Sequence, residues 1–328
     1  MTSDSGDEAS VSLREAGEFR IIDRVTAGRV QPGTTLLGPG DDAAVVAAAD
    51  GRVVGCTDVL VEGVHFRLDW SSPEQVGRKA AAANLADIAA MGAVPTALLV
   101  GLACPSTTPA ARAEALADGL WAEASAVGAG VVGGDLTSGP VVVLSVTALG
   151  SLEGRAPVLR SGARPGDRVA CCGRLGWSAA GLAVLGRGFR SPVALVDAHR
   201  VPAPPYGEGP RAADAGATSM IDVSDGLLAD LGHVARASGV SVRLHSRAFT
   251  VPDRLAEIGS ALGVDPMDWL LTGGEDHALV ATFPVDGELP AGWTEIGAVE
   301  HPGDDGPVVT VDGQVHEGDA GWLHFAKY

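Results

Sequence analysis

Short apolar runs alternate with helix-like segments along most of the chain. Arg52–Val61 and Thr96–Ala103 are two such runs, and both are predicted to be β-strands. Two further strands are expected at Val131–Val132 and Val141–Leu149, after a helix that opens at Thr108-Pro109. This alternation indicates an α/β or α+β fold.

The helix between the first two strands has clear boundary signals. Ser72 is expected to be its N-cap, Pro73 its first helical residue and Gln75 the capping-box partner of Ser72. The apolar pattern continues to about Met91, and Gly92 is the expected stop. The pattern therefore predicts one long helix packed beside the first two strands.

The second half of the chain repeats the alternation. It starts with a strand candidate at Arg168–Gly173, and Ser219–Val223 is a second one. A helix over Asp225–Ser238 should follow, with Ser224 as its cap and Gly239 as its stop. The remaining strand candidates are Val240–Leu244, Ala278–Phe283, Thr294–Val299 and Val308–Val311.

The length of the chain, 328 residues, favours two domains over one small core. The segment 151–167 is rich in Gly, Arg and Pro and contains the turn Arg164-Pro165-Gly166-Asp167, so a linker is expected there. The sequence predicts a mobile acidic tail over residues 1–16, an N-terminal domain over 17–150 and a C-terminal domain over 168–328.

The net charge of the chain limits the kinds of partner that it is expected to bind. The chain has 23 Lys and Arg against 41 Asp and Glu, a formal net charge of −18, which argues against nucleic acid and anionic membranes. It does not exclude a nucleotide, because bound Mg²⁺ lets a carboxylate-rich site hold phosphates. No stretch approaches the roughly 18 apolar residues of a membrane span. With its polar, acidic start, the chain is expected to be cytoplasmic.

The cysteines indicate buried free thiols in a reducing compartment. The four, Cys56, Cys104, Cys171 and Cys172, form no CxxC pair. Cys171 and Cys172 are adjacent in a strand-like run, so their side chains should point to opposite faces.

Candidate chemistry lies in six acidic motifs, each beside glycine or small residues. They are Gly40-Asp41-Asp42, Thr57-Asp58, Asn84-Leu85-Ala86-Asp87, Gly133-Gly134-Asp135, Asp222-Val223-Ser224-Asp225-Gly226 and Gly273-Gly274-Glu275-Asp276. Scattered carboxylates of this kind suit Mg²⁺, which takes oxygen ligands and keeps several waters. Any single motif could instead be a turn or a cap. Asp58 and Asp222 argue against that alternative, because unpaired charge is costly in an apolar strand.

Several common site types are absent from the sequence. The run Gly38–Ala43 satisfies GxGxxA, but its two carboxylates would occupy the place of a pyrophosphate, so a Rossmann site is rejected. No P-loop, protein-kinase signature, HExxH, GxSxG or EF-hand spacing occurs. His65 follows the strand of Asp58, and a surface or hydrogen-bonded histidine is the alternative there.

Seven blocks in register resemble thiamine-monophosphate kinase, of the superfamily that includes aminoimidazole ribonucleotide synthetase and selenophosphate synthetase. The matching blocks are Gly38–Val45, Thr57–Phe66, Asn84–Ala93, Gly133–Thr137, Arg160–Asp167, Ile221–Leu227 and Thr272–Asp276. The resemblance runs from about Glu18 to Phe325. It implies a two-domain aminoimidazole ribonucleotide synthetase-like fold and a homodimer that pairs through the N-terminal sheet.

The resemblance also implies residue roles. It implies catalytic roles for Asp58, Asp87 and Asp222. The implied magnesium ligands are Asp42, Cys56, Thr57, Asp58, Asp87, Asp135, Asp222 and Asp225. The implied ATP contacts are Gly134, Asp135, Arg160 and Ser224, and the implied thiamine monophosphate contacts are His65, Glu275 and Trp322. Two positions depart from the family: Cys56 stands where serine is frequent, so only its carbonyl oxygen suits a metal, and His277-Ala278 replaces a tyrosine and an acidic residue.

The implied reaction suits a site made of carboxylates. A phosphomonoester has a second pKa of about 6, so the acceptor is already dianionic and needs no general base. The obstacle is charge: two unit charges about 4 Å apart repel by roughly 4 kcal/mol at an effective dielectric of about 20. Several Mg²⁺ ions would screen that repulsion. An indole face such as that of Trp322 attracts a cationic thiazolium by about 0.5–2 kcal/mol.

Three alternatives stay open. The chain could be another ATP-dependent member of the superfamily with a different acceptor, although the reactive N-terminal cysteine expected of selenophosphate synthetase is absent. It could be a non-catalytic nucleotide or thiamine-phosphate binding protein, or a magnesium-dependent phosphatase. Formation of ADP that requires both Mg²⁺ and thiamine monophosphate would distinguish these alternatives.

Overall fold

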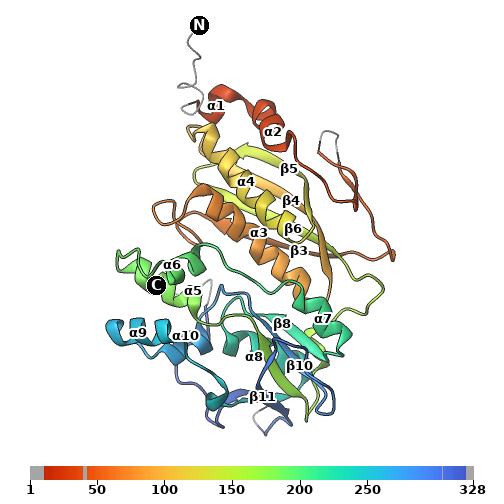
Figure 1. Ribbon diagram of the computed structural model, residues 1–328, viewed down its shortest axis with the longest axis vertical. Coiled ribbons are helices and arrows are strands. Elements are labelled where there is room, and N and C mark those ends of the chain that lie inside the picture. Colours follow the sequence, from red (N-terminus) through yellow and green to blue (C-terminus); the bar gives the residue numbers. More distant parts are fainter. Residues whose placement is uncertain (1–10, 40–42, 305, 323–328) are drawn as a thin grey trace. The chain divides into compact units, whose positions relative to one another are not determined.

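The computed structural model describes residues 11–39, 43–304 and 306–322. The chain divides into two compact units (Figure 1). The first comprises Met1–Ile88 and Pro95–Ser151, and the second comprises Ala89–Val94 and Leu152–Tyr328. The mixed α/β class that the sequence predicted is confirmed, since both units combine helices with sheets.

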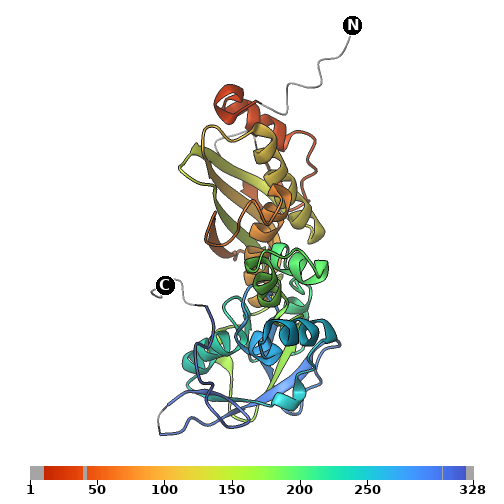
Figure 2. The same cartoon turned by 90° about the vertical axis from the view of Figure 1, so that its left-hand side faces the viewer.

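The first unit is a four-stranded sheet covered by helices. Its elements are α1 (Leu13–Ala16), α2 (Glu18–Thr26), β1 (Thr35–Leu37), β2 (Val45–Val46), β3 (Val54–Val61), α3 (Pro73–Ala90), β4 (Val94–Cys104), α4 (Ala110–Ala126), β5 (Gly130–Ser138) and β6 (Val143–Ser151). The strand order is β3-β6-β4-β5, and β1 and β2 form a separate ribbon. α3 and α4 lie on one face of the sheet (Figures 1 and 2).

The predicted start of α3 is confirmed. The Gln75 backbone N–H donates to Ser72 Oγ at 3.2 Å, and the Ser72 N–H donates to Gln75 Oε1 at 2.9 Å, which is a complete capping box. The helix ends at Ala90, and Gly92 turns the chain with φ +73°. The stop near Met91 was therefore placed correctly.

Two glycines let α3 and α4 touch backbone to backbone. A Cβ on Gly77 would lie 2.0 Å from the Leu116 carbonyl oxygen, and a Cβ on Gly119 would lie 2.0 Å from the Glu74 carbonyl oxygen. No side chain fits at either position without moving a helix. The pair therefore sets how closely the two helices pack.

The predicted tail is shorter than expected. α1 has its own capping box, in which the Ser12 N–H donates to Glu15 Oε2 at 2.9 Å. The Leu13 N–H donates to the Thr108 carbonyl oxygen at 2.9 Å, so the segment is attached to the start of α4. Residues 11–16 are thus part of the first unit, and residues 1–10 lie outside the described part.

The second unit contains a six-stranded sheet. Its elements are η2 (Arg160–Gly162), β7 (Arg168–Cys172), α5 (Trp177–Gly186), α6 (Val193–Arg200), α7 (Glu208–Asp214), β8 (Ser219–Asp222), α8 (Leu227–Ser238), β9 (Ser241–Leu244), η3 (Ser246–Ala248), α9 (Asp253–Leu262), α10 (Pro266–Thr272), β10 (Leu279–Phe283), β11 (Thr294–Glu300) and β12 (Val309–Val311). The strand order is β12-β9-β11-β7-β10-β8. β12 and β9 run parallel, and the other pairs are antiparallel.

Cys171 and Cys172 show that both faces of this sheet are covered. Cys171 belongs to the core that packs against α8, whereas Cys172 belongs to the core that includes Ala212 of α7. Burial raises the pKa of Cys171 to about 12 and that of Cys172 to about 11, so both stay as thiols. The predictions of opposite faces and of free cysteines are confirmed.

The start of α8 differs from the prediction. Its N-cap is Gly226, and Ser224 makes no capping contact. Instead, Asp230 Oδ2 accepts the N–H groups of Asp225 at 3.1 Å and Gly226 at 3.0 Å. An acidic side chain inside the helix thus replaces the expected cap, whereas the predicted stop at Gly239 is confirmed by its φ of +67°.

The segment 152–167 is a folded part of the second unit. Val158 is buried in the core that contains Ala212, and η2 lies beside α8. The predicted turn is present, since the Arg164 N–H donates to Asp167 Oδ2 at 3.0 Å. No described helix combines the length and apolar character that crossing a membrane would require.

Candidate active site

In the first unit, β3 and α3 bring together three residues of the predicted motifs, Asp58, Asn84 and Asp87, with the neighbouring Cys56. Cys56 and Asp58 lie two residues apart on β3, so they share one face of the strand. Asn84 and Asp87 lie three apart on α3, which places them on one side of the helix. Asn84 Oδ1 accepts the Asp58 N–H at 3.0 Å, and the Cys56 thiol donates to the Asn84 carbonyl oxygen at 3.3 Å.

The pKa of the Cys56 thiol is affected by burial and by the acidic side chains of this cluster. Burial raises its pKa well above the ordinary value, and the nearby carboxylates of Asp87 and Asp58 raise it further. Without a bound cation, the thiol therefore stays protonated. That only the carbonyl oxygen of Cys56 suits a metal stays a prediction.

His65 is held at the end of β3. Its Nδ1 accepts the Val61 backbone N–H at 3.0 Å, and its own N–H donates to the Val61 carbonyl oxygen at 3.0 Å. Because Nδ1 accepts, the ring is neutral and its proton is on Nε2. Lys79, which is buried, donates to the His65 carbonyl oxygen at 3.2 Å.

Asp135 and Thr57 lie apart from that cluster. Asp135 is exposed on β5, at the opposite edge of the sheet from β3. Three strand spacings, about 14 Å, separate its backbone from that of Asp58. The Thr57 hydroxyl donates to the Val146 carbonyl oxygen at 3.0 Å and, as its strand position requires, points away from the face of Asp58. At Gly134 a Cβ would lie 2.0 Å from the Val100 carbonyl oxygen, so packing alone requires a glycine there.

In the second unit, one loop organises most of the predicted residues. The loop 223–226 accepts backbone hydrogen bonds from three directions: Glu275 donates to Ser224 at 2.8 Å, His277 to Val223 at 3.0 Å and Trp322 to Asp225 at 2.9 Å. The structure therefore brings together Asp222, Ser224, Asp225, Glu275 and Trp322, which are up to 100 residues apart in the sequence. Trp322 is anchored by its backbone, and its side chain is exposed.

Negative charge accumulates beneath this loop. Asp222 and Asp230 are both buried, and His277 Nδ1 lies 3.0 Å from Asp222 Oδ2. Burial and the charge of Asp222 raise the pKa of Asp230 to about 7, although its hydrogen bond from Gly226 opposes the shift. His277, one of the two departures from the family pattern, is thus a direct partner of a predicted magnesium ligand.

Glu275 and His277 have left-handed backbone conformations, with φ of +63° and +52°. Such angles are costly for residues other than glycine, and they concentrate at functional sites. The Glu275 side chain is about one-third exposed, and its Oε2 lies 3.3 Å from Nδ1 of the buried His199. Backbone and side chain of Glu275 are therefore both held in place.

Arg160 lies near the same loop. Burial lowers the pKa of His233 on α8, and Arg236 and Arg160 lower it further, while Asp225 raises it. Arg160 and Asp225 are therefore both close to the His233 ring. The Arg160 carbonyl oxygen accepts from the Ser238 hydroxyl at 2.8 Å, which holds η2 against α8.

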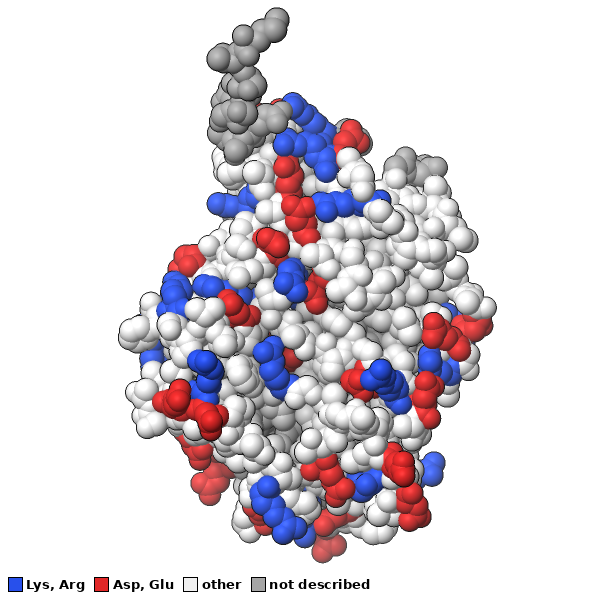
Figure 3. Space-filling view, in the orientation of Figure 1, with Lys and Arg blue, Asp and Glu red and all other residues white. Residues whose placement is uncertain are grey.

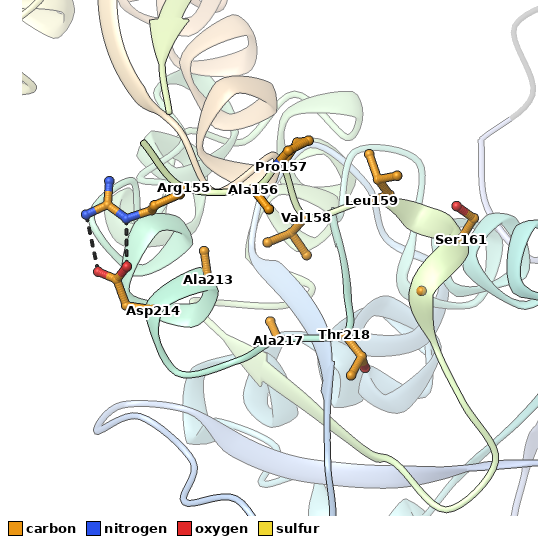
Figure 4. A pocket seen from close by; sticks show the side chains of 11 residues that line it. Arg155, Ala156, Pro157, Val158, Leu159, Ser161, Ala213, Asp214, Ala217 and Thr218 are labelled. Atoms are coloured by element: carbon orange, nitrogen blue, oxygen red, sulfur yellow. Dashed lines mark hydrogen bonds and ion pairs between the residues drawn. The ribbon is translucent and has the colours of Figure 1, made fainter. Parts of the chain in front are cut away.

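A separate surface cavity of about 510 Å³ lies in the second unit (Figure 4). Its walls come from residues 155–159, from Ser161 and Gly162, and from the end of α7 with the turn that precedes β8. Arg155 at one end is already paired with Asp214, at 2.7 and 3.2 Å. The Thr218 hydroxyl donates to Asp167 at 2.6 Å. The side chains of Arg155, Asp214 and Thr218 thus already have protein partners, and none of the predicted site residues lines the cavity.

The acidic residues of the site fit Mg²⁺, which keeps waters and phosphate oxygens as ligands, better than a metal ion that binds only to protein side chains. Among the described residues, no three His, Cys, Asp or Glu side chains form a group that could hold a metal ion by themselves. Mg²⁺ is commonly held by one or two carboxylates together with waters and substrate phosphates. Asp58 with Asp87, and Asp222 with Asp225, are two such pairs. Asp42 lies outside the described residues.

Four residues that matter here were not assigned roles from the sequence. Asn84 stood inside an acidic motif, and its buried position shows its role in holding Asp58. Asp230 accepts from Asp225 and Gly226, which are close in the sequence, but it looks like an ordinary helical residue there. His199 and Ser178 carry no local signal, because their contact joins residues 21 positions apart. On the face shown in Figure 3, basic side chains lie among acidic ones.

Comparison with known proteins gives consistent results. The family model for the N-terminal domain of AIR synthase related proteins matches residues 40–152. A thiamine-monophosphate kinase of Mycobacterium tuberculosis is 56% identical over 320 residues, 97% of this chain and 94% of the relative. That of Corynebacterium glutamicum is 43% identical, over 96% and 95% of the two chains. The solved structure of AaThiL complexed with AMPPCP and TMP superposes with a TM-score of 0.78 at 32% identity, covering 96% of this chain and 99% of that one.

Proposed function

This chain belongs to the thiamine-monophosphate kinase family, with the AIR synthase-like fold, and on that basis we propose that it phosphorylates thiamine monophosphate with ATP. The products are thiamine diphosphate and ADP, and the step is the last in thiamine diphosphate synthesis. The observation that carries the proposal is the near-full-length match to relatives named for this activity. AaThiL, similar over nearly its whole length, was solved with AMPPCP and TMP.

The proposed reaction is a direct, in-line transfer. A phosphate oxygen of thiamine monophosphate forms a bond to the γ-phosphorus of ATP, and the bond from that phosphorus to the β,γ-bridging oxygen breaks. The acceptor is a dianion near neutral pH, so no side chain has to remove a proton. Positioning and charge compensation are the tasks left to the protein.

Magnesium would supply positive charge between the two anionic substrates. Within the first unit, Asp58 and Asp87 would hold Mg²⁺, with Asp42 as a further ligand. Within the second unit, Asp222 and Asp225 would do so. Burial is the main reason that the pKa values of Cys56 and Asp230 are raised, and neighbouring carboxylates add to both shifts. A bound cation would offset this second contribution.

The organic end of the substrate would be recognised by other residues. The exposed indole of Trp322 would lie against the cationic thiazolium, and the carboxylate of Glu275 would accept a hydrogen bond from the aminopyrimidine. His65 presents a neutral ring whose proton lies on Nε2, which can donate to a phosphate oxygen. Gly134, Arg160 and Ser224 would contact ATP.

The oligomer we propose is a homodimer formed through the first unit's sheet. β3 and β5 are its edge strands, and exposed strand edges are a common site of pairing with another chain. The sheet face opposite α3 and α4 carries exposed apolar residues, including Val59 at 48% and Leu99 at 37% exposure. A second copy would also bring its Asp135 to the β3 edge, where Asp58 lies.

A coupled assay of ADP formation with thiamine monophosphate, ATP and Mg²⁺ tests the proposal. ADP should form only when all three are present. Free thiamine in place of thiamine monophosphate should give no turnover, and a chelator that removes Mg²⁺ should abolish it. Phosphate release without ADP would indicate a phosphatase instead. Binding of both substrates without turnover would indicate a binding protein.

Asp58→Asn tests the metal assignment within the same assay. It should lower kcat by at least about a hundredfold, since a neutral amide is a poor Mg²⁺ ligand. Asp69→Asn is the matched control, because Asp69 is exposed and pairs with Arg67 at 2.8 Å on the surface. Near-wild-type turnover of Asp58→Asn would refute the role of Asp58.

A further inference from the structure

We propose that His199 is a positioning residue, which fixes the carboxylate of Glu275 in the orientation that receives the substrate. The inference rests on the proposed function, in which Glu275 contacts thiamine monophosphate. It adds a residue that neither the motifs nor the family resemblance singles out.

The contacts of His199 define its role. Its Nδ1 lies 3.3 Å from Glu275 Oε2 and 3.1 Å from Ser178 Oγ. A carboxylate only accepts hydrogen bonds, so the proton of the ring must be on Nδ1 to stabilise this pair. The ring is buried while Glu275 is about one-third exposed, so the histidine supports the carboxylate from the protein side.

The same contacts exclude a serine-nucleophile arrangement. In such a relay the serine and the acid bond to different nitrogens of the histidine. Here Ser178 and Glu275 both face Nδ1, and Ser178 itself is buried. Ser178 therefore helps to hold the ring.

The position of the ring is set by close helix packing. At Gly181 of α5 a Cβ would lie 2.1 Å from the Leu195 carbonyl oxygen and 3.0 Å from the His199 Cβ. Only a glycine at that point lets α6 approach α5 closely enough to bring His199 beside Ser178. The ring therefore has little room to move.

A closed set of contacts connects these residues to the strained loop. The Ser178 N–H donates to Asp276 Oδ1 at 3.0 Å, and Asp276 is the neighbour of Glu275 in the chain. The Glu275 N–H donates to the Ser224 carbonyl oxygen at 2.8 Å and fixes its backbone at φ +63°. A glutamate side chain retains three rotatable bonds on such a backbone, and the close contact with His199 Nδ1 limits them.

The two amide isosteres of histidine test this role. In His199→Asn the side-chain amide can occupy the place of Nδ1, whereas in His199→Gln it reaches the place of Nε2. His199→Gln should raise the KM for thiamine monophosphate roughly tenfold, the effect of losing one hydrogen bond to a charged group. Its KM for ATP and its kcat should change less than about twofold, because the side-chain contacts described for His199, with Glu275 and Ser178, include no proposed ATP ligand. His199→Asn should keep the KM for thiamine monophosphate within about threefold of wild type.

Two further measurements separate positioning from general stability. In the Glu275→Gln background, adding His199→Gln should raise KM little further, because both changes remove the same contact. The exposed His301→Gln is the matched control and should leave both KM values unchanged. Thermal unfolding of every variant shows whether a loss of stability accompanies the kinetic effect.

The outcomes are distinct. If the wild type is active while His199→Gln keeps the wild-type KM for thiamine monophosphate, that result would overturn this inference and leave the proposed function standing. Equal rises in the KM values for both substrates, in the Asn and Gln variants alike, would also overturn it, since that pattern reflects a distorted fold. A wild type without turnover that depends on thiamine monophosphate would overturn the proposed function and this inference with it.

Discussion

Asp276 is almost fully buried, and its titration should be visible in the stability of the protein. Burial raises its pKa from 3.8 to about 7, although the Ser178 N–H and the charge of Arg174 oppose the shift. The folded state therefore binds a proton that the unfolded state has already released between about pH 4 and pH 7. Stability from this group is fully present below pH 4 and falls as pH rises to about 7, by on the order of 2–4 kcal/mol.

Asp276→Asn should remove that pH dependence. The amide oxygen can still accept from Ser178, and no carboxylate remains to ionise. The melting temperature of the variant, measured without ligands from pH 5 to 8.5, should rise relative to wild type as pH increases. Parallel curves for the two proteins would show that Asp276 keeps an ordinary pKa.

Trp322 offers a test of substrate recognition at a single side chain. Its backbone is anchored to Asp225 while its indole is 41% exposed, so removing the ring should disturb the fold little. Trp322→Ala should raise the KM for thiamine monophosphate about 2- to 30-fold through loss of the cation–π contact. Trp322→Phe should retain part of the affinity. An unchanged KM in Trp322→Ala would remove the stacking role.

The packing of α3 against α4 in the first unit depends on two glycines, and a substitution at one of them tests it. Gly119→Ala should lower the free energy of unfolding by about 1–3 kcal/mol, because the methyl group meets the Glu74 carbonyl oxygen of α3. Gly232→Ala on α8 is the control. Its nearest neighbour is the flexible end of Arg236, so improved helix propensity should leave stability unchanged or slightly higher. Urea unfolding of both variants measures the difference, and equal stabilities would contradict the close contact.

Elements with local boundary signals could be predicted from the sequence. Ser72 with Gln75 and the stop at Gly239 are short-range features, and both were placed correctly. The cap of α8 was wrong because its acceptor, Asp230, lies inside the helix and looks like an ordinary helical residue. α1 was missed although Ser12 and Glu15 form a local capping box, and its attachment to Thr108 joins segments far apart in the chain.

The candidate site shows the same limit. The acidic motifs identified which residues to examine, and two groups of them do come together, around Asn84 and around the loop 223–226. Local sequence patterns do not reveal the order of the strands in a sheet. The separation of Asp58 from Asp135 across the sheet, and the contact of His199 with Glu275, therefore required the structure.

For the whole molecule, strand order has a consequence for assembly. Asp58 and Asp135 lie on opposite edge strands of the first unit's sheet, about 14 Å apart. In the proposed dimer, we expect a phosphate-binding site to take these two residues from different copies of the chain. Each contact across a two-fold axis occurs twice, so each of two sites would combine Asp58 of one copy with Asp135 of the other.

Mixing two inactive variants tests this arrangement directly. Asp58→Asn and Asp135→Asn should each be inactive alone, and each should migrate at twice the mass of one chain. If the copies exchange at random in an equal mixture, about half of the dimers are mixed, and each mixed dimer contains one site with both aspartates and one site with neither. Activity should then recover to about a quarter of the wild-type value per chain. If both aspartates of a site came from one copy, every site in the mixture would lack one of them, and no activity would return. Co-expression of differently tagged variants, followed by isolation of the mixed dimer, removes any dependence on exchange, and the isolated dimer should then show about half the wild-type activity.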